Sequence, residues 1–234
     1  MSAEKSANLT IKIKNFRVIK EANIDLSRRG VIFYGANGGG KSTAIHSLLG
    51  LFGLRDFIDD LDGEIYLKYD DDYIKVYRKE QLLLDTKIER YKEEGVPFDD
   101  PRALDAIKLF WAKLGVRRIA HINGDILNIY ELYRATYDRG PSLRLDINDE
   151  NSWREIMTQP QLLYEEINDK FLLNYIRELI NSYIDIIYID IRLAVGPDRY
   201  KWIKWPRLAY GHRRAAMMMI GLLADVILIE GFDN

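Results

Sequence analysis

The sequence contains no cysteine. This absence excludes disulfide bonds, thiolate metal sites and cysteine nucleophiles. It fits a reducing compartment, and we expect a cytoplasmic location. A signal peptide is also missing, as is any apolar run near the roughly 18 residues that a membrane-spanning helix needs. The longest apolar stretch, residues 215–229, is interrupted by Gly221 and Asp225. We therefore expect no membrane segment.

An excess of charge of either sign is absent too. The formal net charge is −2, from 34 basic and 36 acidic residues. This balance argues against a general polyanion binder, so any contact with nucleic acid would need a local basic patch. The 234 residues are 47% hydrophobic and 30% charged, which is the composition of a globular protein with one large domain.

Hydrophobic periodicity predicts an α/β fold with an N-terminal antiparallel β-meander. Alternating apolar and polar residues indicate half-buried strands at residues 9–16, 18–26, 64–69, 73–79 and 82–91. The apolar run at residues 31–34 is typical of a buried strand. Further strands are expected at residues 116–122, 184–194, 202–206 and 226–229.

Helices are predicted at residues 42–52, 100–114, 152–182 and 211–223. In the second of these, Asp100 is the expected N-cap and Pro101 occupies the first helical position. Residues 126–136 are ambiguous between strand and helix, and we interpret them as helix.

A glycine-rich loop is the most specific motif in the sequence. It matches the pattern G-x-x-x-x-G-K-[ST] between an expected strand and an expected helix, and it consists of Gly35, Ala36, Asn37, Gly38, Gly39, Gly40, Lys41 and Ser42, followed by Thr43. Glycines let backbone N–H groups approach phosphate oxygens, and the N-terminus of the following helix favours anions. We expect Lys41 to reach the β- and γ-phosphates of ATP, Ser42 to bind Mg²⁺ and Thr43 to help hold the α-phosphate. The alternative is a glycine-rich turn before an ordinary helix.

An acidic side chain is expected to complete the ligands of the magnesium ion together with Ser42. Four apolar residues at 226–229 precede Glu230, as in a buried strand that ends in a carboxylate. The alternative for Glu230 is an exposed acid at the end of a core strand.

Three stretches together resemble the ABC-class ATPase heads of the SMC, RecF and OLD type. They are residues 13–17 with the glycine loop, residues 208–214 with Tyr210, Gly211 and His212 as a degenerate signature, and the strand that ends at Glu230. The resemblance implies a P-loop NTPase with a mixed sheet, an N-terminal β-meander and a helical subdomain. It implies one head over residues 1–234, with a nucleotide-binding core and β subdomain at 9–95 and 184–234 and a mainly helical insertion at 96–183.

The resemblance also implies a mechanism. Two heads would form a homodimer around two Mg-ATP molecules, with Tyr210, Gly211 and His212 facing the partner's γ-phosphate and Arg17 near the nucleotide. Lys41 and Glu230 would be the catalytic residues. Arg17 is otherwise a solvated arginine at a strand end, and residues 212–214 are otherwise the basic start of a helix.

The sequence departs from the family at several places. Gly231 follows Glu230 where a second acid is usual, with Asp233 as its only nearby substitute, and the signature lacks its serine. No glutamine is evident in the loop where the family places one beside magnesium, and the chain stops at Asn234, so we expect a truncated, split or degenerate head.

These departures leave several hypotheses open. The leading one is an ATPase head in DNA maintenance or defence. The others are an ATP-binding switch with weak hydrolysis, a nucleic-acid-binding module based on the basic and aromatic residues 199–207, and a transporter ATPase.

Overall fold

The computed structural model describes residues 8–28, 30–132, 140–149, 151–152, 184–187, 190–194, 200–203, 210–222 and 224–231. The chain divides into two compact units. Unit 1 comprises Met1–Arg117 and Leu132–Gly140, and unit 2 comprises Arg118–Glu131 and Pro141–Asn234. Each unit has its own sheet, and each is described by itself below.

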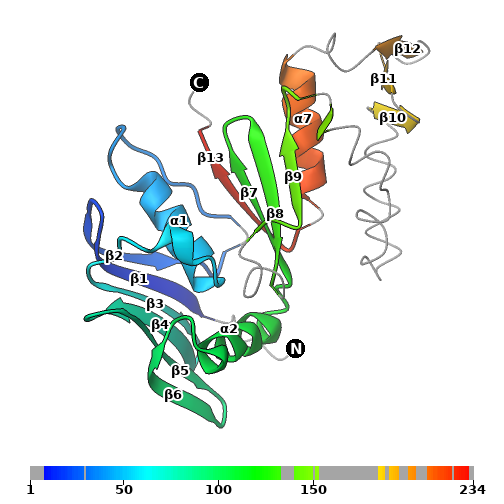
Figure 1. Ribbon diagram of the computed structural model, residues 1–234. Coiled ribbons are helices and arrows are strands. Elements are labelled where there is room, and N and C mark those ends of the chain that lie inside the picture. Colours follow the sequence, from blue (N-terminus) through cyan, green and yellow to red (C-terminus); the bar gives the residue numbers. More distant parts are fainter. Residues whose placement is uncertain are drawn as a thin grey trace, which may run out of the picture. The chain divides into compact units, whose positions relative to one another are not determined.

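Unit 1 is built on a six-stranded antiparallel sheet with the order β2-β1-β3-β4-β5-β6 (Figure 1). The strands are β1 (Leu9–Phe16), β2 (Ile19–Asp25), β3 (Glu64–Tyr69), β4 (Asp72–Arg78), β5 (Leu82–Ile88) and β6 (Tyr91–Pro97). Alternate residues such as Ile11, Ile13, Ile65 and Leu67 are buried on one face. The period of two therefore confirms the predicted meander, and β6 extends it by one strand beyond the prediction.

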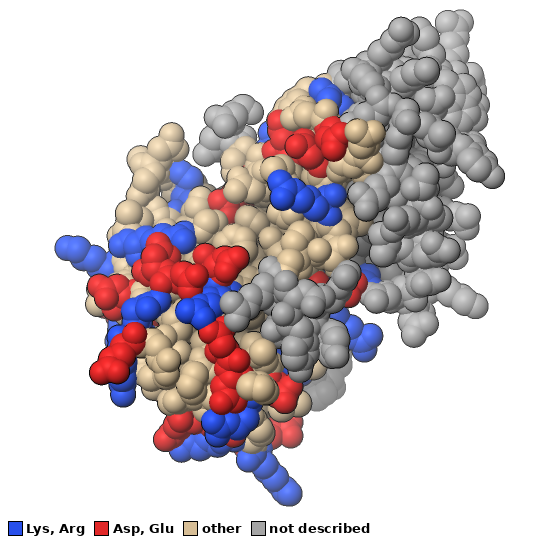
Figure 2. Space-filling model, in the orientation of Figure 1, with Lys and Arg blue, Asp and Glu red and all other residues tan. Residues whose placement is uncertain are grey.

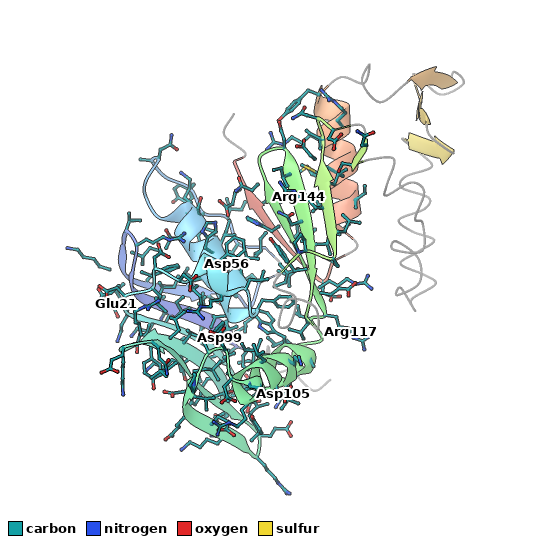
Figure 3. All side chains as sticks on the ribbon, in the orientation of Figure 1. Glu21, Asp56, Asp99, Asp105, Arg117 and Arg144 are labelled. Carbon is teal, nitrogen blue, oxygen red and sulfur yellow. The ribbon has the colours of Figure 1, made fainter. Side chains whose placement is uncertain are left out.

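Two helices pack on this sheet, and a short 3₁₀ helix contacts the first of them. Helix α1 (Lys41–Leu51) contacts β1, β3 and β4, whereas α2 (Pro101–Lys113) contacts β4, β5 and β6. Asp100 caps α2 as predicted, because its side chain accepts a hydrogen bond from Arg102 N at 2.9 Å. The 3₁₀ helix η1 (Arg55–Phe57) is joined to the loop before α2 by an ion pair between Arg55 and Asp99. Figure 3 labels Asp99.

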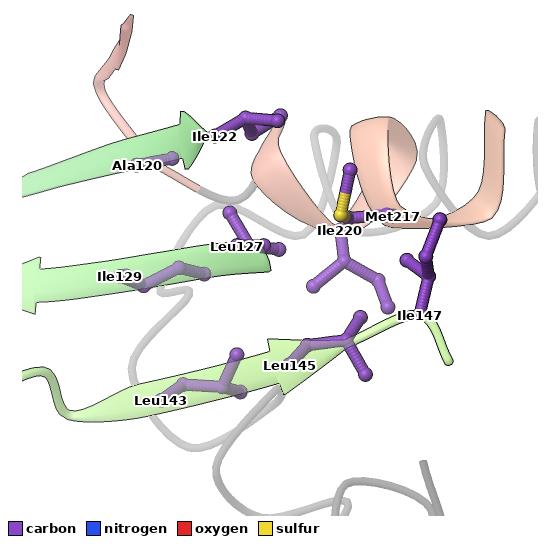
Figure 4. Packing of buried hydrophobic residues seen from close by; sticks show 9 residues of the cluster. All are labelled: Ala120, Ile122, Leu127, Ile129, Leu143, Leu145, Ile147, Met217 and Ile220. Atoms are coloured by element: carbon purple, nitrogen blue, oxygen red, sulfur yellow. The ribbon is translucent and has the colours of Figure 1, made fainter. Parts of the chain in front are cut away.

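Unit 2 contains a four-stranded mixed sheet with the order β13-β7-β8-β9. Its strands are β7 (Arg118–Asn123), β8 (Ile126–Glu131), β9 (Leu143–Asp146) and β13 (Val226–Glu230), and only the pair β13 and β7 is parallel. Helix α7 (Tyr210–Gly221) packs on β7 and β8. Figure 4 shows Met217 and Ile220 of this helix against apolar side chains of the sheet, among them Ile122, Leu127 and Leu145.

Three short strands form a separate antiparallel sheet within unit 2, namely β10 (Ile184–Ile187), β11 (Asp190–Ala194) and β12 (Tyr200–Ile203). Two strands were expected over this part of the sequence, at residues 184–194 and 202–206. The first expectation was wrong in one respect, because residues 184–194 fold back on themselves and Ile187 pairs with Asp190.

Two other expectations were wrong. Residues 31–34 form no strand, and Ile32 and Tyr34 are 85% and 91% exposed. A short apolar run is buried only where other strands pair with it, and this run pairs with no strand among the described residues. Residues 126–131 are strand β8 rather than helix, because Ile126–Ile129 pair with both β7 and β9. Local pattern alone does not reveal such pairing.

The expected division into a core and a helical insertion stays a prediction. The described part of residues 96–183 holds α2 together with β7, β8 and β9, whereas the helices expected at 152–182 fall almost wholly outside the described residues. Of the helices that are described, none has the length and apolar character needed to cross a membrane. On the face shown in Figure 2, basic and acidic side chains lie interspersed over the described surface.

Candidate nucleotide-binding site

The glycine loop of unit 1 is an exposed connection that ends at helix α1. Gly35, Gly38 and Gly40 have φ angles of 144°, 79° and 89°. These are values of the left-handed region, which only glycine enters freely. The loop closes on itself through a hydrogen bond from Gly39 N to Ala36 O at 3.1 Å. The three positive φ values explain why this backbone requires glycine.

The lysine of the motif lies across the loop. Lys41 Nζ donates hydrogen bonds to Gly35 O at 2.7 Å and to Ala36 O at 3.1 Å. An ammonium group on a flexible stem can exchange carbonyl acceptors for phosphate oxygens, which are charged and therefore stronger acceptors. Lys41 is thus held at the loop that is expected to receive the phosphates.

The first turn of α1 presents backbone N–H groups without a side-chain cap. Gly40 is the N-cap residue, its position makes no side-chain cap hydrogen bond, and the first turn contains no acidic residue. The free N–H groups of a helix start attract anions. Ser42 is exposed, so its hydroxyl is accessible, whereas Thr43 is only 6% exposed.

The β1–β2 hairpin packs against the loop at its last glycine. A Cβ atom at Gly40 would lie 2.9 Å from Ile19 Cγ1 and 3.3 Å from Val18 Cγ2. Gly40 is therefore fixed as glycine twice, once by its φ angle and once by this close approach. Neither reason was predicted from the sequence, which suggested glycine only because backbone N–H groups must approach phosphate oxygens.

Arg17, which lies in the turn of this hairpin, is held within unit 1. Its guanidinium makes a two-point ion pair with Asp60, with distances of 2.8 and 3.1 Å, and donates to Phe57 O at 3.2 Å. It also contacts His46 Nδ1 on α1. The hydrogen bond from Arg17 is the main cause that lowers the pKa of Asp60. Arg17 is exposed but paired, and its contact with nucleotide stays a prediction.

In unit 2, Glu230 ends β13 as predicted. Its carboxylate is largely buried and lies 2.8 Å from His121 Nε2 on the neighbouring strand β7. The parallel register places Glu230 opposite Asn123 and Leu228 opposite His121. Sequence reasoning missed this pair, because the two residues lie 109 positions apart and no motif joins them.

The residue after Glu230 has its own partner in unit 2. Gly231 has a φ of +72°, and its carbonyl accepts a hydrogen bond from Arg214 Nη2 at 2.9 Å. Arg214 belongs to the first turns of α7, which begins at Tyr210. The hydroxyl of Tyr210 donates to Asp125, and Gly211 is exposed. Helix α7 therefore starts at the predicted signature, whereas the side chain of His212 and Asp233 lie outside what the structure describes.

The part of the chain that contains the glycine loop matches a known protein family. Residues 10–187, which include the glycine loop, match a family model described as an AAA domain. Since the match covers more than half of the chain, the chain belongs to this family of P-loop, ATP-binding proteins of the ATPase type. The matched range ends before Tyr210 and Glu230 and so does not test them. No curated protein matches the chain.

Proposed function

We propose that the chain binds Mg-ATP through residues 35–43 as one ABC-type head of the SMC, RecF or OLD type. The observation that carries this proposal is the loop itself, in which three glycines have positive φ values and Lys41 lies across the loop carbonyls. A nucleoside triphosphate provides the oxygen acceptors that such a loop needs.

A magnesium ion prefers oxygen ligands, and we propose that Ser42 and Glu230 would each supply one. Ser42 offers an exposed hydroxyl in the first turn of α1, and Glu230 offers a carboxylate that His121 orients. When bound, the ion would neutralise charge on the phosphates. The residues of this chain would bind and orient the nucleotide, with Lys41 as the principal cation.

Lys41→Ala tests the nucleotide site. Loss of a charge-assisted hydrogen bond costs roughly 1.5–3 kcal/mol, so ATP affinity should fall roughly tenfold to a hundredfold. Lys68→Ala is the matched control, because Lys68 is an exposed lysine on β3 of the same unit. Calorimetric titration with ATP measures both variants. Equal affinity in Lys41→Ala and the unmodified chain would refute the nucleotide site.

We also propose that ATP drives homodimerisation, with Tyr210, Gly211 and His212 facing the partner's phosphate. A Cβ atom at Gly211 would meet nothing within 4 Å, so Gly211→Glu should fold normally. The added carboxylate would repel the partner's phosphate and abolish the ATP-dependent dimer. Analytical ultracentrifugation with and without ATP measures this. A dimer that survives the substitution would remove the signature from the interface.

A second candidate function is an ATP-binding switch with slow hydrolysis. Gly231 favours it, because this position has no side chain to polarise water and its carbonyl is held by Arg214. Steady-state turnover of about 1 s⁻¹, which is ordinary for an enzyme, would exclude the switch and support the ATPase. A role in DNA maintenance or defence rests on the family resemblance alone. The strip at residues 199–207, which suggested nucleic-acid binding, lies largely outside the described residues.

A further inference from the structure

The first turn of α7 is held to the sheet of unit 2 by polar side chains. Further along the helix, Met217 and Ile220 are buried against β7, β8 and β9. At the start of the helix, Tyr210 and Arg214 instead make hydrogen bonds to Asp125 and to Gly231 O. Each hydrogen bond of this kind contributes about 1 kcal/mol to stability. We therefore expect the start of the helix to be displaced more easily than its buried part.

Asp125 accepts the first of these hydrogen bonds, the one from Tyr210. It lies in the turn between β7 and β8, and its carboxylate accepts hydrogen bonds from Tyr210 Oη and from Asn148 Nδ2, the latter at 2.8 Å. Its backbone carbonyl accepts from Ile147 N at 3.0 Å. The hydrogen bond from Tyr210 is the largest cause that lowers the pKa of Asp125, followed among the lowering causes by Asn148 and by the charges of Arg214 and Arg213. Asp125 is therefore a charged anchor among donors.

The same turn touches the end of β13. Gly124 N lies 3.5 Å from Glu230 O, and a Cβ atom at Gly231 would lie 3.6 Å from Gly124 N. The turn that holds Tyr210 thus also contacts the peptide that carries Glu230. Arg213 adds a third tie, because its guanidinium donates to Ile147 O at 3.1 Å.

We propose that Asp125 is a positioning residue that couples the first turn of α7 to Glu230. Displacement of Tyr210 frees the turn at residues 124–125, and this turn then no longer supports the end of β13. This proposal rests on the proposed function only where it concerns magnesium, for which Glu230 is the expected ligand. The coupling itself is a property of unit 2 and is measurable without nucleotide.

Hydrogen exchange of the full chain without ATP tests the coupling. Asp125→Ala and Tyr210→Phe should each speed exchange of backbone amides at residues 229–231 as well as at 210–214. Asp149→Ala is the matched control, because Asp149 is an exposed acid of the same unit that accepts a local hydrogen bond from Asn151 N at 3.0 Å. Tyr210→Phe removes one hydroxyl from a side chain that is 45% exposed, so it does not endanger folding. Faster exchange confined to 210–214 in both variants would overturn the proposal.

Magnesium supplies a second readout. ATP affinity in EDTA should be the same for Asp125→Ala and the unmodified chain, whereas the gain in affinity on adding Mg²⁺ should fall roughly tenfold, as for loss of a group that orients a metal ligand. An unchanged gain would refute the positioning role. If the unmodified chain binds no ATP, the proposed function fails, and the exchange experiment alone decides the coupling.

Discussion

His121 Nε2 and Glu230 Oε1 lie 2.8 Å apart on two neighbouring parallel strands, and their side chains are only 3% and 8% exposed. A buried carboxylate needs such a donor, because an unsatisfied one costs roughly 1–3 kcal/mol or more. The contact also fixes which way the carboxylate of Glu230 faces.

His121→Ala should therefore lower the free energy of unfolding by roughly 1–3 kcal/mol. His121→Gln retains a side-chain N–H donor and should lose less. Urea denaturation followed by circular dichroism measures both. If the two variants lose the same free energy, the loss comes from packing alone and the hydrogen bond contributes nothing measurable.

Variants of Arg17 and Asp60 can separate the structural role of Arg17 in the hairpin from its expected role in nucleotide binding. The pair is partly exposed, so that breaking it should cost at most about 1 kcal/mol of stability. If Arg17 reaches the nucleotide, Arg17→Ala should weaken ATP binding roughly tenfold, the size of one charge-assisted contact. Asp60→Asn, which leaves the guanidinium in place, should not. Equal losses of ATP affinity in both variants would show that the pair acts only through the structure of the hairpin.

Gly40→Ala should disrupt the loop more than an alanine substitution at a glycine that has space for a side chain. The left-handed φ of 89° costs an alanine roughly 1–2 kcal/mol, and the new methyl group would meet Ile19 at 2.9 Å. We expect ATP affinity to fall by more than roughly tenfold. Gly30→Ala is the control, because a Cβ atom there meets nothing within 4 Å. Calorimetric titration compares the two, and similar affinities would refute a role for the loop conformation.

The ion pair between Asp72 and Lys113 leads us to expect that the folded chain is less stable in acid. Burial raises the pKa of Asp72, but hydrogen bonds from Glu89 N at 2.8 Å and from Lys113 at 2.5 Å outweigh it and leave this pKa below its ordinary value. Hydrogen bonds with Asp72 and Glu89 raise the pKa of Lys113 to about 12.

A carboxyl whose pKa is lowered in the folded state stabilises the fold above its unfolded pKa of about 4, and this stabilisation disappears as pH falls through the folded value. Urea midpoints measured from neutral to acid pH should therefore fall less steeply for Asp72→Asn than for the unmodified chain. Parallel curves would show that Asp72 contributes no pH dependence.

The features that the sequence predicted well are those with local causes. The motif of the glycine loop is recognised within eight consecutive positions, and Asp100 with Pro101 marks the start of α2. Alternation of polar and apolar residues placed β1 to β5 for the same reason, because each strand buries one face.

The features that the sequence did not predict depend on distant partners. Residues 31–34 have the composition of a buried strand, yet burial depends on neighbouring strands, and among the described residues they have none. The same holds for Asp60 beside Arg17, His121 beside Glu230 and Asp125 beside Tyr210. Each is an ordinary polar residue in its own segment, and its role follows only from strand register or helix docking.

The parallel pairing of β13 with β7 bears on the order in which the chain folds. Strands β3 to β6 are sequence neighbours joined by short turns, so their part of the sheet forms from local contacts. Strand β13 instead pairs across more than a hundred residues, as the His121–Glu230 separation of 109 shows. Closing so long a loop is slow compared with local pairing. During translation, β7 therefore cannot pair along this edge until residues 226–230 have been made.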